Sequence, residues 1–142
     1  MVLLMGGELI LASSSEVRKE LLEKSNISFL SVKPNIDEDA VKTSLLNENY
    51  SPRDIADALA ELKASKISLK NPDSLVLGCD QILEFEGLIL KKPSSKNIAV
   101  QQLMKISGKK HTTYSAAVIF ENAQPIWRFV GKADLFLKNN SE

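Results

Sequence analysis

The chain has 142 residues, of which 44% are hydrophobic and 25% are charged, proportions that are ordinary for a soluble globular protein. Its 18 basic and 18 acidic residues cancel, so no overall charge favours binding to nucleic acid or to an anionic membrane. The single cysteine, Cys79, excludes an internal disulfide and a cysteine-rich zinc site. The single histidine, His111, argues against a histidine-based metal site or a Ser-His-Asp triad. The length predicts one domain over residues 1–142.

The hydrophobic stretches also bear on where the protein is found. None approaches the roughly 20 apolar residues that a helix needs to span a bilayer. The opening MVLLM lacks a basic leader and meets two glycines at once, so a secretory signal is not expected. A lone cysteine fits a reducing compartment. The sequence therefore predicts a cytoplasmic protein.

The first elements are a strand, a helix and a second strand. Residues 9–12 (LILA) predict a buried strand, and the serines that follow can accept hydrogen bonds from the free amides of a helix start. Ser13 and Glu16 have the spacing of a capping box. The helix is expected to turn one apolar side inward, made of Val17, Leu21 and Leu22. FLSVKP predicts a strand that ends at Pro34.

The next predicted helix begins at Ser51-Pro52, because serine is a good N-cap and proline suits the first helical position. Its buried stripe is expected to be Ile55, Leu59 and Leu62, which would place Lys63 near the polar boundary. The acidic residues 37–39 before it are interpreted as a solvated loop.

The second half is richer in strands. Residues 75–77 run as a strand toward Gly78, and QILEFEGLIL predicts a hairpin that turns at Glu86-Gly87. Ser94 or Ser95 is expected to cap a helix that ends at Gly108 and carries Ile98, Leu103 and Ile106. TYSAAVIF and PIWRFVGKADLFL predict a further strand pair across ENAQ. This order of elements indicates an α/β domain with a mixed sheet.

The turn after the first strand is a candidate phosphate site. Free amides at a helix start, serine hydroxyls and the positive end of the helix dipole all suit a phosphate group. Arg18 and Lys19 add cationic donors. An ordinary capped helix with solvated charges explains the spacing as well.

Asp80 with Gln81 is the second candidate. A carboxylate just past the end of a buried strand lies where open α/β sheets tend to bind ligands. It could hold a divalent cation or orient a water as general base, and Gln81 could read the edge of a base. As structural alternatives, Asp80 would cap a turn, Gln81 would point to solvent, and Lys63 and Lys92 would be surface lysines.

The other unusual side chains favour structural roles. His111, flanked by Lys110 and Thr112, is interpreted as a packing or capping residue. Trp127 and Phe129 alternate on a strand and could stack a base, but core packing is the favoured interpretation.

The order of five segments along the chain resembles the Maf-like family, from about residue 9 to the C-terminus. These segments are LILASSSEVRKELLEKSNISF, IDE at 36–38, IADALAELKA at 55–64, LVLGCDQILEFEGLILKKP at 75–93 and ISGKKHTTYSAAV. Proteins of this family are cytoplasmic house-cleaning nucleotide pyrophosphatases, also associated with inhibition of septum formation. Five separated motifs in one order are far more specific than any single motif.

The resemblance implies an elongated α/β fold related to the inosine-triphosphate pyrophosphatases, with a mixed twisted sheet and a cleft between two lobes. It implies cleavage of a nucleoside triphosphate between the α and β phosphates, with a divalent cation such as Mg²⁺ or Mn²⁺. Matched by position, Asp80 is the proton acceptor and lies with Glu38 at the metal. The matched phosphate-binding residues are Ser13, Arg18, Lys63 and Lys92.

Gln81 bears on the substrate. Many family members have Thr at this position and resemble a branch acting on dTTP and UTP. The sequence GCDQ looks like the other branch, which prefers 7-methyl-GTP, and an amide can pair with a purine edge where a hydroxyl cannot. Gln81 is therefore a predicted substrate-binding residue.

The chain departs from the family at two places. Glu16 stands where proline is usual, which puts a negative charge beside the predicted phosphate site. The sequence ADLFLKNNSE stops where similar proteins continue into a further helix and strand, so a C-terminally shortened domain is expected. A catalytically weak nucleotide-binding or regulatory protein remains the alternative function. Similar proteins are often homodimers, which makes a homodimer a further expectation.

Overall fold

The structure is a computed structural model that describes residues 8–138. Residues 1–7 and 139–142, at the two ends of the predicted domain 1–142, lie outside the described residues. The described elements follow one another as β1 (Leu9–Ala12), α2 (Glu16–Lys24), β2 (Phe29–Val32), α3 (Glu38–Asn47), α4 (Pro52–Ser68), β3 (Leu75–Phe85), β4 (Leu88–Leu90), α5 (Lys96–Ile106), β5 (Lys110–Glu121) and β6 (Gln124–Phe136).

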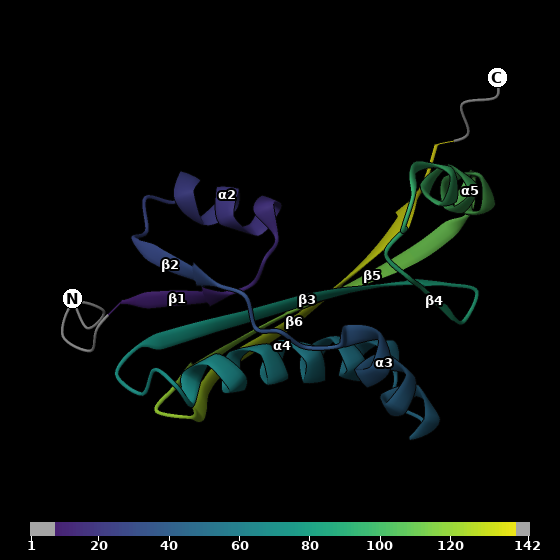
Figure 1. The fold of residues 1–142 in the computed structure, drawn as a ribbon. Coiled ribbons are helices and arrows are strands. Elements are labelled where there is room, and N and C mark those ends of the chain that lie inside the picture. The colour runs from purple at the N-terminus through teal and green to yellow at the C-terminus, as the bar shows by residue number, and fades with distance from the viewer. Residues whose placement is uncertain (1–7, 139–142) are drawn as a thin grey trace.

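These strands form one mixed sheet, in the order β2-β1-β3-β5-β6, with β4 paired to β3. β1 runs parallel to β2 and β3, whereas β4, β5 and β6 join by antiparallel pairs. Helices α2 and α4 lie on opposite sides of the sheet (Figure 1). The predicted α/β class with a mixed sheet is confirmed. No helix within residues 8–138 is long and apolar enough to cross a membrane.

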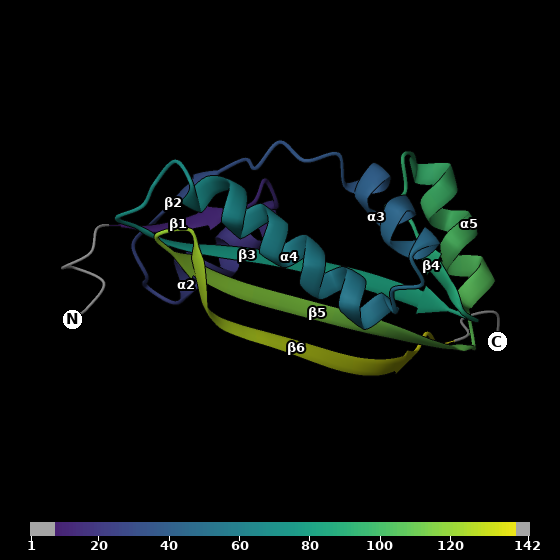
Figure 2. The same ribbon diagram turned by 90° about the horizontal axis from the view of Figure 1, so that it is seen from below.

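Helix α4 supplies much of the core and runs along β3 and β5 (Figure 2). Its start is as predicted, because the Ser51 side chain accepts a hydrogen bond from the Asp54 amide. The predicted stripe is wrong at Leu62, which is 38% exposed, while Lys63 is only 5% exposed. The reason is geometric: residues four apart share a helix face, so Lys63 lies in line with the buried Ile55 and Leu59.

Two other helices differ from expectation. Helix α2 is capped by Ser15 rather than by a Ser13–Glu16 capping box, because the Ser15 side chain accepts a hydrogen bond from the Arg18 backbone amide. It has no buried residue, and Val17 is 66% exposed. Helix α3 begins within the acidic run that was expected to be a loop, with Asp37 as its N-cap. The same carboxylates that suggested a solvated loop suit a helix start.

β3 is continuous through Asp80, so the expectation that this residue follows the end of a strand is wrong. On one side, β3 pairs with β5 over most of its length. On the other side it pairs with β1 at residues 75–78 and with β4 at residues 83–85. Residues 79–82 therefore have no strand beside them on that side within the described chain. We call this gap the notch.

The predicted strand pair in the second half is confirmed as β5 and β6, joined at Asn122-Ala123. His111 is buried on β5, in agreement with a packing residue. The prediction of core packing is wrong for Trp127 and Phe129, which are 51% and 57% exposed. Their rings stack on each other with centroids 6.5 Å apart. Arg128 between them binds α4, so the two rings lie on the other face of β6.

Candidate active site at the notch

The notch is the place where the predicted site residues converge. β1 ends with Ala12 beside Gly78, so Ser13 leaves the sheet at the level of Cys79. β4 runs antiparallel to β3 and ends with Leu90 beside Leu83, so the chain that follows leaves toward residues 81 and 82. That chain carries Lys91 and Lys92. One cationic segment and one serine-rich turn thus border the same short stretch of β3.

A buried lysine is the centre of the site. Lys63 reaches from α4 to β3, where its Nζ donates hydrogen bonds to the Cys79 carbonyl at 3.1 Å and to Asp80 Oδ1 at 2.9 Å. It also forms an ion pair with Glu38 Oε1 at 3.1 Å, at the start of α3. Lys63 and Asp80 are each 5% exposed, whereas the Glu38 side chain is 45% exposed. The three residues form a small ionic cluster with one open side, at Glu38.

Asp80 is not fully satisfied by this cluster. Its second oxygen, Oδ2, is buried and has no hydrogen-bond partner within residues 8–138. A buried carboxylate oxygen without a partner costs free energy, which native proteins rarely accept without a functional reason. Oδ2 is therefore a buried acceptor whose hydrogen-bonding capacity is unused within the described residues.

The two carboxyl groups respond differently to the cluster. Burial raises the pKa of Asp80 above its ordinary value, and the attraction of Lys63 only partly offsets it. Burial acts in the same direction on Glu38, but the charge and hydrogen bond of Lys63, with help from Lys42, hold the pKa of Glu38 below its ordinary value. Asp80 is thus the carboxylate that takes up a proton more readily, which suits a general base.

Close packing of α4 on β3 allows Lys63 to reach the strand. A Cβ atom on Gly78 would lie 2.1 Å from the Ala60 carbonyl oxygen and 2.9 Å from Ala64 Cβ. No other residue fits there without displacing the helix. The small side chains of Ala60 and Ala64, on either side of Lys63, allow α4 to lie this close to β3, and this sets how deeply the Lys63 ammonium group enters the notch.

The N-terminal turn is ordered by its serines. The Ser15 amide donates to Ser13 Oγ at 3.0 Å, and Ser31 Oγ donates to the Ser13 carbonyl at 2.9 Å. Arg18, in the first turn of α2, is close enough for its charge to act on Cys79. Burial raises the pKa of the Cys79 thiol against the opposing charges of Arg18 and Lys63, so the thiol is neutral rather than nucleophilic.

Other predicted residues lie around the notch without joining the cluster. Gln81 is exposed, and because side chains alternate along a strand it faces the side of β3 opposite to Asp80. Lys92 is also exposed. Within residues 8–138, no hydrogen bond or ion pair joins Ser13, Arg18, Gln81 or Lys92 to Lys63, Asp80 or Glu38. Gln81 and the Lys63–Asp80 cluster therefore lie on opposite faces of β3.

The donor atoms fit one kind of metal site. No cluster of three or more His, Cys, Asp and Glu side chains that could hold a metal occurs in the described part of the chain. Asp80 Oδ2 and the Glu38 carboxylate can both donate oxygen ligands, and Lys63 holds the two carboxyl groups near each other because it pairs with both. Mg²⁺ is commonly held by one or two carboxylates together with phosphate oxygens and water. The residues thus fit a cation shared with a phosphate ligand.

Sequence reasoning missed two contributors to this site. Lys42 lies one helical turn after Glu38, and its charge lowers the pKa of both Glu38 and Asp80. The i,i+4 spacing of Glu38 and Lys42 was the available signal. The sequence marks Gly78 only as the residue toward which the strand at 75–77 runs, and its close contact with α4 has no signal in a single sequence.

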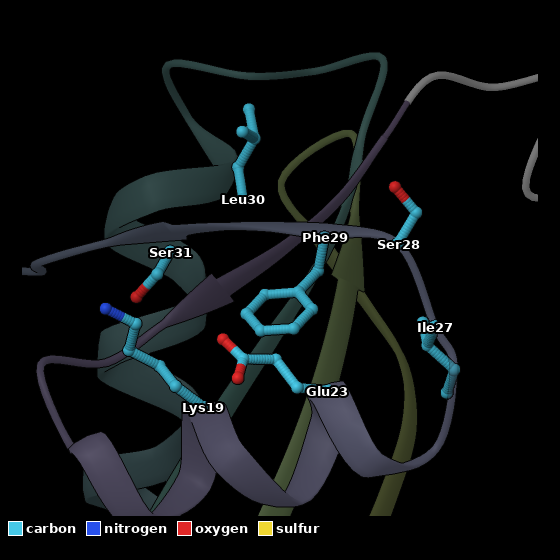
Figure 3. A pocket seen from close by; sticks show the side chains of 7 residues that line it. All are labelled: Lys19, Glu23, Ile27, Ser28, Phe29, Leu30 and Ser31. Atoms are coloured by element: carbon cyan, nitrogen blue, oxygen red, sulfur yellow. The ribbon is translucent and has the colours of Figure 1, made fainter.

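A separate open groove of about 500 Å³ lies between α2 and β2 (Figure 3). Its polar lining includes Lys19 and Glu23 of α2 and Ser31 of β2. None of the residues of the Lys63 cluster lines it. The groove is therefore distinct from the notch.

Two kinds of named relatives are similar to this chain. A nucleoside triphosphate pyrophosphatase of Ruegeria pomeroyi is 52% identical over 134 residues, covering 94% of this chain and 67% of the relative. A 7-methyl-GTP pyrophosphatase of Brucella abortus is 40% identical over 132 residues, covering 93% of this chain and 66% of the relative. The chain thus spans about two thirds of the length of these relatives.

The fold is also similar to that of a solved structure. The Ham1 protein of Staphylococcus aureus matches with a TM-score of 0.50 at 14% sequence identity, covering 90% of this chain and 70% of the other. The family model described as "Maf-like protein" matches residues 8–142. The chain therefore belongs to the Maf-like protein family.

Proposed function

We propose that this protein is a nucleoside triphosphate pyrophosphatase that releases a nucleoside monophosphate and pyrophosphate. The observation that carries the proposal is the buried, unpartnered Asp80 Oδ2 next to the Lys63 ammonium, at the notch, which one cationic segment and one serine-rich turn border. An oxygen of this kind can accept a proton from an attacking water, and the nearby cations suit a polyphosphate. Relatives that carry this activity in their names support the same reaction.

In this proposal the water attacks the α-phosphorus and its proton passes to Asp80 Oδ2. The bond from the α-phosphorus to the bridging oxygen breaks, and pyrophosphate leaves. The raised pKa of Asp80 favours that transfer. Lys63 holds the other carboxylate oxygen in place through its 2.9 Å hydrogen bond. Arg18 and Lys92 bind the phosphates from the two borders of the notch, and the ordered turn at Ser13 offers hydroxyl and amide donors.

A divalent cation would be held by Asp80 and Glu38. When bound, such a cation neutralises phosphate charge and polarises the phosphoryl oxygen. Lys63 already ties both carboxylates together at 2.9 and 3.1 Å, so they are oriented before any cation arrives. The exposed side of Glu38 leaves a path for the cation from solvent.

We further propose that the substrate is a modified purine nucleotide, 7-methyl-GTP. Gln81 faces the open side of β3, where its amide is free to bind the edge of a base. Two Brucella relatives named 7-methyl-GTP pyrophosphatases, at 39–40% identity, support this substrate. The relatives at 43–52% identity carry a name without a specified nucleotide, so they favour the general reaction.

The test is a comparison of kcat/KM for 7-methyl-GTP, dTTP and UTP in the wild type and in Gln81→Ala. The change should cost 7-methyl-GTP about 1–3 kcal/mol, roughly 5- to 150-fold, because a polar edge of the base loses its partner. The pyrimidine nucleotides should lose much less. Gln124→Ala, an exposed glutamine on β6, is the matched control. Equal losses for all three nucleotides would refute the role of Gln81, and a wild type that prefers dTTP would refute the substrate.

A further inference from the structure

Gln81 has direct neighbours on its own face of the sheet. Ser115 of β5 lies opposite Gln81, and Gly131 of β6 lies opposite Ser115. Asp80 binds α4 through Lys63, so Gln81, one residue later, faces the other side of β3. Residues that are directly paired across strands point to the same face, so Ser115 and Gly131 face that side too. We call Gln81, Ser115 and Gly131 the cross-strand row.

The cross-strand row differs from the rows on either side of it. These flanking rows, two residues away along each strand, are Cys79, Ala117 and Phe129 on one side and Leu83, Thr113 and Ala133 on the other. They are mainly apolar, whereas the cross-strand row offers an amide, then a hydroxyl, then no side chain. A Cβ on Gly131 would lie 3.1 Å from the Phe129 ring, so this ring leans over Gly131 and closes the far end of the row. A few polar groups between apolar walls are typical of small-molecule sites.

The order of the strands sets which part of a ligand meets Ser115. The notch lies along one side of β3 and β5 pairs with the other side, so Ser115 lies one strand further from the notch than Gln81, about 4.8 Å. In the proposed function the phosphates bind at the notch. A base that extends from there across the sheet meets Gln81 first and Ser115 second. A purine is longer than a pyrimidine by one fused ring, so a purine reaches Ser115 and a pyrimidine stops short of it.

Resting on the function proposed above, we propose that Ser115 is a second specificity-determining residue, which binds the far edge of a purine base together with Gln81. A guanine carries both a carbonyl acceptor and an amino donor on its edges. The Gln81 amide and the Ser115 hydroxyl each offer donors and acceptors, so together they can pair with neighbouring polar atoms of such an edge. Neither side chain forms a hydrogen bond within residues 8–138, and both are exposed there. Binding a base would therefore break no internal hydrogen bond of either side chain.

The direct test is the selectivity of variants at position 115. Ser115→Ala should lower kcat/KM for 7-methyl-GTP roughly 5- to 150-fold, because a polar atom of the base loses its partner. The same change should have little effect on dTTP and UTP, whose bases stop short of this residue. Ser115→Thr keeps the hydroxyl and should keep the preference for the purine. Ser115→Leu fills the far end of the row with an apolar side chain and should exclude the purine more strongly than Ser115→Ala does.

Thr113→Val is the matched control. Thr113 lies on the same strand and the same face, in the flanking row, and the change removes a hydroxyl at nearly constant volume. It should leave the selectivity unchanged. A loss for Ser115→Ala that is no larger than that of Thr113→Val, or that is equal for 7-methyl-GTP and UTP, would overturn the proposal.

Binding measurements separate this inference from the proposed reaction. The dissociation constants of 7-methyl-GTP and UTP are measured by titration calorimetry in an Asp80→Asn background, with and without Ser115→Ala. If the wild type hydrolyses neither nucleotide but Ser115→Ala selectively weakens 7-methyl-GTP, the reaction is refuted and the role of Ser115 is supported. If the wild type hydrolyses 7-methyl-GTP in preference and Ser115→Ala leaves both the rate and the affinity intact, the role of Ser115 is overturned and the reaction stands. Tighter binding of UTP than of 7-methyl-GTP would also overturn the role of Ser115.

Discussion

Replacing Lys63 by methionine tests whether the ionic cluster is as buried and as tightly paired as the structure shows. Methionine keeps most of the length and apolar volume of lysine but removes the ammonium group. Asp80, at 5% exposure, would then have neither of its oxygens paired, since Oδ2 already lacks a partner. Glu38 is 45% exposed and would be solvated instead. Asp80 should therefore dominate the loss of stability.

The magnitude of this loss follows from the cost of keeping Asp80 protonated. A carboxyl group with an ordinary pKa near 3.9 costs about 1.36 kcal/mol per pH unit to protonate above that pH. The cost is about 4 kcal/mol at pH 7 and about 1.5 kcal/mol at pH 5. These values are upper limits on the stability lost at Asp80, because the buried carboxyl can always take up a proton instead. The pH 7 value agrees with the roughly 3–5 kcal/mol lost when one member of a buried ion pair is removed.

The sign of the pH dependence is also determined. Without Lys63, the pKa of Asp80 would rise further above its unfolded value, because burial raises it and Lys63 is the main influence that lowers it. A group with a raised pKa in the folded state stabilises the fold less as pH rises through that range. Lys63→Met should therefore lose stability, relative to the wild type, as the pH rises from about 4 toward 7.

The assay is urea unfolding of both proteins at pH 5 and pH 7. Lys66→Met is the control, because Lys66 lies on the same helix but is exposed and donates only to the Asn35 carbonyl. It should cost little at either pH. A Lys63→Met loss that is equal at both pH values, or no larger than that of Lys66→Met, would refute the buried pairing with Asp80.

Three further predictions concern packing, capping and phosphate binding. Gly78→Ala should lower the free energy of unfolding by about 3 kcal/mol or more, because its methyl group would lie 2.1 Å from the Ala60 carbonyl oxygen. In thermal unfolding, a loss as small as that of Gly131→Ala would contradict this. Ser51→Ala should cost about 1 kcal/mol in urea unfolding through loss of the α4 N-cap, and an unchanged stability would remove that role. Arg18→Ala should weaken binding of triphosphate more than of monophosphate, with a difference that shrinks at high salt. Equal weakening for both nucleotides, measured by titration calorimetry, would indicate general damage instead.

The strands and the main helix could be predicted because their signals are local. The apolar run at residues 9–12, the Glu86-Gly87 turn and the Ser51-Pro52 helix start each report on neighbouring residues. Helix α3 was missed because its acidic start resembles a loop, although Val41 and Leu45 have helical spacing and pack against the core. A stripe at this spacing, together with the Asp37 cap, was sufficient to predict the helix.

The site depended on information that a single sequence lacks. Lysine is polar in any hydrophobic pattern, so burial of Lys63 became evident only with Asp80, 17 residues later, as its partner. The notch exists because β1 and β4 pair with different parts of β3, which no local pattern encodes. The structure places Asp80, Lys63 and Glu38 together, and their catalytic, phosphate-binding and metal-binding roles stay predictions. The roles of Arg18 and Lys92 in phosphate binding stay predictions.

The most direct test of the central claim is the fate of the oxygen from water during hydrolysis of a nucleoside triphosphate in H₂¹⁸O with Mg²⁺. The account predicts pyrophosphate and a monophosphate as products, with the label in the monophosphate. Asp80→Asn should lower the rate by about 10²–10⁴-fold. Asp73→Asn, an exposed control, should leave it unchanged. A diphosphate product, label in the pyrophosphate, or an Asp80→Asn variant that is folded and as fast as the wild type would contradict the account.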